Sequence, residues 1–162
     1  MTAPKMPSAL LTQVLCFVVL WTGCATSHSP PFQVDLSAPG WRVQQGQAVW
    51  HPGRGKAELA GELVLASRGA SDAVVEFIKT PFPIVTAQRI GEQWRIEFGS
   101  GQRTFAGHGR PPGRLIWLHL SECLQRRERP PRPWTLTWDD PAHWRFENPS
   151  SGESLAGYFR TE

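Results

Sequence analysis

The stretch Gln93-Trp94-Arg95-Ile96-Glu97-Phe98 alternates apolar with polar or charged side chains without interruption. Successive side chains of a β-strand point to opposite faces, so the three apolar residues share one face and the polar residues share the other. This pattern is typical of an antiparallel strand with one buried face and one face in water. It predicts a β-sheet protein with a single buried sheet face.

The same period of two extends from Trp41 to Phe105. Apolar residues continue the buried face in three further segments. Two of them, Leu59–Leu65 and Asp72–Lys79, come before the prolines at 81 and 83, and the third, Ile84–Ile90, follows these prolines. Pro81-Phe82-Pro83 is expected to separate the last two. Glycine turns at 90–93 and 99–101 join neighbouring strands, which favours a meander of antiparallel strands over crossover connections.

The pattern changes after the paired prolines at 111 and 112. Segment 113–127 carries apolar residues at helical spacing, which predicts one long helix. Three prolines between Glu128 and Pro133 end it, and alternation then returns in 134–138, 144–146 and 155–159. The sequence therefore predicts several antiparallel strands, one helix and three further strands.

These elements predict a mainly β (α+β) fold, a curved antiparallel sheet or incomplete barrel with one helix covering its concave face. The apolar face of the strands needs cover, and the apolar stripe of the helix can supply it. Between the two we expect either a solid core or a ligand cavity. The residues that would line such a cavity are Phe77, Ile84, Trp94, Ile96, Phe98, Phe105, Ile116, Trp117, Leu120 and Leu124.

The N-terminus has the three parts of a secretory signal. Lys5 precedes the apolar run Leu10–Leu20, and the small residues Thr22-Gly23 stand directly before Cys24. This ending resembles a bacterial lipoprotein signal, which implies cleavage before Cys24 and acylation of that residue as a membrane lipid anchor. We expect a signal peptide at 1–23, a lipidated tether at 24–40, rich in serine and proline, and one domain at 41–162.

The order of elements behind a lipoprotein signal resembles the LolA/LolB family of periplasmic lipoprotein carriers. The closest local likeness is Phe77-Ile78-Lys79-Thr80-Pro81-Phe82-Pro83 followed by Ala87-Gln88-Arg89-Ile90. The resemblance implies a half-barrel that binds acyl chains, with lipoproteins or a periplasmic carrier as partners. The lipidated Cys24 favours the membrane-anchored member, LolB. Phe82 or Ile84 is the nearest candidate for the family's exposed apolar residue.

Location follows from the same resemblance. Ala25 follows Cys24, where an aspartate would retain a proteobacterial lipoprotein in the inner membrane. For a Gram-negative source, this implies the periplasmic face of the outer membrane. The formal net charge of +3 is too small to indicate a nucleic-acid partner, and the basic run 126–132 is expected to be a solvated helix end.

Chemistry at a catalytic or metal centre is not indicated. His119, Glu122 and Cys123 have a spacing that could gather metal ligands, but Cys123 falls on the apolar stripe, where a free cysteine behaves as a small apolar residue. Adjacent Asp139 and Asp140 precede a proline and are expected to form a turn. We therefore expect a non-enzymatic protein without metal or cofactor.

Two functions remain open. The chain is either a membrane-anchored carrier that binds an acyl chain or a lipidated protein for transfer at the outer membrane, or a structural or partner-binding lipoprotein with a solid core. They differ in the volume between helix and sheet, because an ordinary core leaves no void of ligand size.

Overall fold

The computed structural model describes residues 32–99 and 101–160. The strands are β1 (Arg42–His51), β2 (Leu59–Arg68), β3 (Asp72–Lys79), β4 (Phe82–Ile90), β5 (Gln93–Phe98), β6 (Arg103–His108), β7 (Thr135–Trp138), β8 (His143–Asn148) and β9 (Glu153–Phe159). Two short helical turns, η1 (Ile116–His119) and η2 (Ser121–Gln125), lie between β6 and β7 and are called here the helical segment. The expectations for the signal, Cys24 and residues 24–31 of the tether lie outside the described residues.

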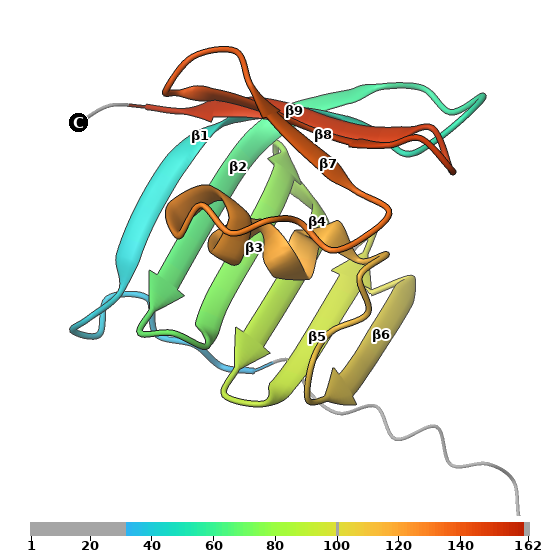
Figure 1. Cartoon of the computed structure of the whole chain (residues 1–162). Helices are drawn as coiled ribbons and strands as arrows, with labels where there is room; N and C mark the ends of the chain where they lie inside the picture. The colour runs from blue at the N-terminus through green and yellow to red at the C-terminus, as the bar shows by residue number, and fades with distance from the viewer. Residues whose placement is uncertain (1–31, 100, 161–162) are drawn as a thin grey trace, which may run out of the picture. The chain divides into compact units, whose positions relative to one another are not determined.

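All nine strands belong to one antiparallel sheet in the order β6-β5-β4-β3-β2-β1-β9-β8-β7. Strands β1 to β6 form the expected meander, and the chain then returns so that β9 pairs with β1. Strands β6 and β7 are the two edges, so the sheet does not close into a barrel. Figure 1 shows that β7–β9 turn away from the direction of β3–β6, with the helical segment between them. The expectation of a mainly β, antiparallel fold is confirmed.

One face of the sheet, called here the inner face, carries the apolar core. The strand registers align Leu65, Val75, Ala87 and Ile96 in a row across β2 to β5. Each of these four side chains is 2% exposed or less. The alternation read from Gln93–Phe98 therefore predicts the buried face correctly, because cross-strand neighbours on one face share one environment.

Small residues on the inner face of β9, β1 and β2 make room for large rings. Ala48 pairs with Gly61 on one side and with Gly157 on the other. A Cβ atom at Gly61 would lie 2.9 Å from the Phe77 ring, and one at Gly157 would lie 2.9 Å from the Trp144 ring. Glycine is therefore required where these rings press on the sheet.

The expected long helix at 113–127 is shorter in the structure and is not a regular α-helix. Ile116–His119 is a 3₁₀ turn and Ser121–Gln125 a π-helical turn. All residues from Ile116 to Ser121 are buried, so the segment has no polar face over this length. A regular α-helix buries one apolar stripe and leaves its other face in water. This segment buries consecutive side chains instead, and its backbone takes 3₁₀ and π turns rather than the α form.

The opposite, outer face was expected to be solvated throughout, but Val74, Gln88 and Arg95 on it are at most 9% exposed. Residues 32–41 contact this face. The amide of Phe32 donates to Gln88 Oε1, and Gln88 Nε2 donates to the Phe32 carbonyl, both at 3.2 Å. The part of the expected tether that the structure describes is thus held against β4. Strand β4 also begins at Phe82, inside the expected proline break.

Replacement of Gly61 by valine should destabilise the domain by ~1–3 kcal/mol, the range for overpacking a filled core. The new side chain would collide with the Ile78 carbonyl, 2.5 Å from the Cβ position, and with the Phe77 ring. The matched control is Ala60→Val, one residue earlier on the exposed outer face. Urea unfolding followed by tryptophan fluorescence measures both variants, and equal losses would contradict the packing described here.

Candidate functional site

The inner face and the helical segment meet around Trp117, which is 1% exposed. Its ring centroid lies 5.4 Å from that of Trp50, edge to face, and 5.5 Å from that of Phe77. Such ring pairs add ~0.5–1.5 kcal/mol beyond the area they bury. The neighbouring Ile116 and Leu120 are equally buried in the same cluster. Trp117 thus joins the helical segment to β1 and β3.

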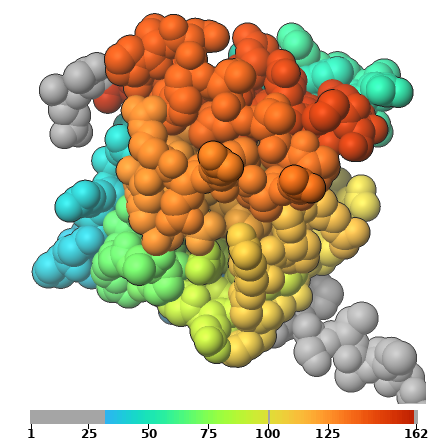
Figure 2. Space-filling view, in the orientation of Figure 1, coloured from blue at the N-terminus to red at the C-terminus, as the bar shows by residue number. Residues whose placement is uncertain are grey.

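The ten residues expected to line a cavity lie in or beside this cluster. Seven are 9% exposed or less, namely Phe77, Trp94, Ile96, Ile116, Trp117, Leu120 and Leu124. Ile84 and Phe98 pack against them from the margin, and Phe105, 37% exposed, contacts the Phe98 ring at 6.4 Å. In Figure 2 the orange atoms of the helical segment and the following loop press closely on the strands. Most of the expected lining residues are therefore buried against one another in the apolar cluster.

The inner cluster holds several buried ring nitrogen atoms that lack a hydrogen-bond partner among the described residues. They are the indole N–H groups of Trp94, Trp117, Trp134 and Trp144, together with the Nε2 atom of His119. An unsatisfied buried polar group costs ~1–3 kcal/mol. The cluster therefore consists mainly of apolar side chains but contains several polar atoms without a hydrogen-bond partner among the described residues.

Polar contacts fasten the helical segment to the strands. Glu122 forms an ion pair with Arg89 of β4, and its other oxygen lies 3.4 Å from His119 Nδ1. Burial alone would raise the pKa of Glu122, but the hydrogen bond and charge of Arg89, with help from His119, hold that pKa below its usual value. The ion pair is therefore intact at neutral pH.

A second fastening joins the end of the segment to β1 and β2. Gln125 Oε1 accepts a hydrogen bond from the Ser67 hydroxyl, and Gln125 Nε2 donates to Gln44 Oε1 at 3.0 Å. Beyond it, the Arg127 guanidinium lies 3.5 Å from the centre of the Trp138 ring. Arg127 has φ 57°, a left-handed conformation that ends the segment. The expected solvated helix end is thus in part a contact with β7.

The sequence gives no signal for the Arg89–Glu122 pair, because 33 positions separate the two residues. Its two side chains are about one-fifth exposed, which shields the pair partly from solvent. Of His119, Glu122 and Cys123, the first two contact each other, with 3.4 Å between His119 Nδ1 and Glu122 Oε2. Burial raises the pKa of the Cys123 thiol to about 12, and the described residues hold no cluster of three or more side chains that suits a metal ion.

The turn expected at Asp139-Asp140 is present. Asp140 Oδ1 accepts hydrogen bonds from the amides of Ala142 and His143, at 2.7 and 2.8 Å. These two bonds and the His143 side chain lower the pKa of Asp140. The carboxylate is occupied in shaping the β7–β8 connection.

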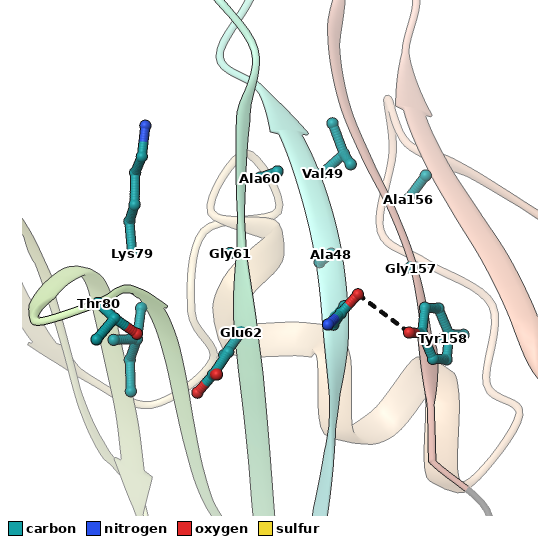
Figure 3. Close-up of a pocket in the computed structure, with 12 residues that line it drawn as sticks. Ala48, Val49, Ala60, Gly61, Glu62, Lys79, Thr80, Ala156, Gly157 and Tyr158 are labelled. Atoms are coloured by element: carbon teal, nitrogen blue, oxygen red, sulfur yellow. Dashed lines mark hydrogen bonds between the residues drawn. The ribbon is translucent and has the colours of Figure 1, made fainter.

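A shallow groove of about 420 Å³ crosses the outer face of β9, β1 and β2. Figure 3 shows small side chains along its floor, Lys79 and Thr80 at one side, and the hydrogen bond between Tyr158 and Gln47 at the other. This groove lies on the face opposite the expected cavity. A second hollow of about 300 Å³ lies between residues 32–41 and the side chains of Arg68 and Ile90.

No protein-family model matches this chain, and no curated protein matches it either. Among the described residues, no helix is long and apolar enough to cross a membrane.

A Glu122→Gln variant should lose ~1–2 kcal/mol of stability near pH 7, since it leaves the Arg89 guanidinium partly buried without its anion. The pKa of Glu122 is lower in the folded state, so its contribution is present above the unfolded pKa and is lost as pH falls through the folded one. Unfolding free energies of parent and variant should therefore converge in acid. A difference that stays constant from pH 7 into acid would contradict this role.

Proposed function

We propose that this chain is an exported, non-enzymatic lipoprotein that binds an acyl chain, of a lipid or a lipidated protein, on its inner face. The helical segment serves as the cover of the concave face, and the arrangement described above is the closed, unloaded state. The observation that carries the proposal is the contact of Trp117, on the helical segment, with the Trp50 and Phe77 rings of the inner face.

The segment is suited to move as a unit. Prolines at 111 and 112 precede it and three more follow before β7. Proline interrupts regular backbone hydrogen bonding, so each group of prolines separates the segment from the strands next to it in the chain. Its attachments are the Arg89–Glu122 ion pair, the Gln125 hydrogen bonds and the Trp117 contacts. Opening would break few of the strand–strand contacts.

The chemistry of the interior fits an acylated ligand. Each methylene buried there gains ~0.8 kcal/mol. The unpaired indole N–H groups of Trp94 and Trp117 offer donors to the carbonyl oxygens of an ester. An acyl ester would therefore satisfy both the apolar rings and the buried donors.

A second candidate function is a structural or partner-binding lipoprotein whose core holds no ligand. The close packing of Trp117 against Trp50 and Phe77 favours it, and both hollows described above lie on the outer face. In this case the domain acts only through its surface.

Delivery to a membrane would use the β3–β4 turn. Phe82 is 65% exposed and pairs in register with Lys79, so an apolar ring and a cation stand together at the tip. Aromatic rings and lysine side chains favour the interface of a bilayer. Together with acyl chains on Cys24, this supports a location at a membrane surface, and Ala25 after Cys24 supports the periplasmic face of the outer membrane.

Photo-cross-linking tests the carrier proposal in membranes. Cells that make the full chain are fed a photoreactive fatty acid and irradiated, and cross-linked peptides are mapped by mass spectrometry. We expect adducts within Gln93–Phe98 and the helical segment, in addition to label on Cys24. Phe98→Glu should reduce the inner-face adducts several-fold, since it places a carboxylate beside Trp50 at the margin of the cluster.

The matched control is Val49→Glu, which adds the same charge to an outer-face position that is 40% exposed. Unfolding midpoints of both variants are to be measured, as the control that both variants remain folded. Adducts confined to Cys24 and the exposed Phe82 turn, with none on the inner face, would favour the solid-core function over the carrier.

The anchor is tested separately by metabolic labelling with a fatty-acid analogue. Cys24→Ser should abolish incorporation of the label into the chain, while Cys123→Ser should leave it unchanged, because the Cys123 thiol is buried and protonated. Full labelling of the Cys24→Ser variant would show that this residue is not the acylation site.

A further inference from the structure

The two edges of the open sheet differ in how they are protected. Strand β7 has four residues and lies between prolines and the Asp139-Asp140-Pro141 turn. Short length, proline and charge are the usual means by which proteins protect an edge strand from pairing with another chain. Strand β6 has six residues, contains no proline, and pairs with β5 without a register shift.

The side chains of β6 are mostly exposed and its centre is uncharged. Residues Thr104 to Gly107 lie between Arg103 and His108, and of these six only Gly107 is partly buried. Among the described strands, none pairs with the far side of β6. An exposed, regular and uncharged edge is a ready template for strand addition.

The direction of the free backbone groups follows from one hydrogen bond. The amide of Gly109 donates to the Glu92 carbonyl at 2.6 Å. The backbone N–H and C=O groups of the odd-numbered residues in β6 therefore point toward β5. Backbone groups alternate along a strand, and Thr104, Ala106 and His108 therefore direct their N–H and C=O groups to the open side. An incoming antiparallel strand would bond to these three residues.

An aromatic row on the inner face ends at this edge. Trp50 stacks on Phe98 at 6.1 Å, and Phe98 meets Phe105 at 6.4 Å. Phe105 lies opposite the buried Ile96, yet it is 37% exposed because no described strand on the far side of β6 continues the row. A further aromatic side chain beyond β6 would complete the row.

A second copy of the same strand supplies that neighbour. In the antiparallel register that sets Phe105 opposite its own copy, Thr104 bonds to Ala106 of the other chain, and each Arg103 faces the other chain's Gly107. No like charges stand directly opposite in this register. Phe105 occupies a non-hydrogen-bonded pair, in which opposing side chains approach most closely.

We propose that β6 pairs with β6 of a second copy of this chain, antiparallel and centred on Phe105, to form one continuous sheet across the two copies. The backbone hydrogen bonds of the β6 edge hold the two copies together, and the Phe105 contact adds to them without being required for pairing. The pairing leaves the helical segment and the inner cluster unchanged, so it is independent of whether that cluster binds an acyl chain.

Cysteine cross-linking of the full chain in its native membranes tests the pairing. With a mild oxidant, Phe105→Cys should give a covalent dimer as its main product, since the two Cβ atoms of such a pair lie within ~4.5–5.5 Å. The matched control is Val49→Cys, also half-exposed on a strand but on the outer face, which should stay at the background of the parent chain.

Adding Ala106→Pro to the Phe105→Cys chain should abolish the dimer. The Ala106 amide faces the open side, so proline there removes an intermolecular donor and no bond to β5. Ala106→Ser keeps the amide and should keep the dimer. Sedimentation of the otherwise unaltered chain in detergent should likewise show a loss of dimer with Ala106→Pro alone.

Three results would overturn the proposal. They are a Phe105→Cys chain that stays monomeric, a dimer that persists with Ala106→Pro, and a Phe105→Cys chain that cross-links to a different protein without any dimer. The last result would assign the β6 edge to another strand partner.

Discussion

The burial of Trp117 between Trp50 and Phe77 is the contact on which the rest of the structure depends. Trp50 is the penultimate residue of β1, Phe77 lies on β3, and the indole ring joins them at 5.4 and 5.5 Å. Without this wedge, the inner face of a nine-stranded open sheet would expose large rings to water, at a cost of ~25 cal/mol per Å². The glycines at 61 and 157 then follow, since the bent sheet needs space for the rings beneath it.

Apolar and polar contacts hold the helical segment in different ways. Burial of Trp117 and its neighbours supplies the energy, whereas Arg89–Glu122 and the Gln125 hydrogen bonds fix the place at which the segment sits. Partly exposed pairs are weak in net stability but specific in geometry. The proposed carrier requires that the helical segment leave the inner face while the strand-to-strand hydrogen bonds persist, whereas a purely structural core does not require it.

Local patterns in the sequence predict much of the sheet. The alternation in Gln93–Phe98 predicts its buried face, and the glycine at 91, with φ 58°, marks the β4–β5 turn as expected. The return of β9 to β1 could not be predicted, because the pairing of Ala48 with Gly157 joins distant parts of the chain and no local pattern encodes it. The burial of Arg95 could not be predicted either, because the alternation of side chains indicates only the face of the sheet on which Arg95 lies.

For the candidate site, the sequence identifies the apolar residues but not their packing. Side-chain pattern shows that Ile96 and Trp117 turn inward, yet whether they enclose a void depends on rotamers and on the sheet's curvature. The central claim is that the helical segment opens independently of the strands. Native-state hydrogen exchange of the full chain measures this most directly. The account predicts that the amides of Leu118 to Leu124 exchange at a markedly lower opening free energy than those of Leu65 and Val75. Equal protection of both groups, through global unfolding alone, would contradict it.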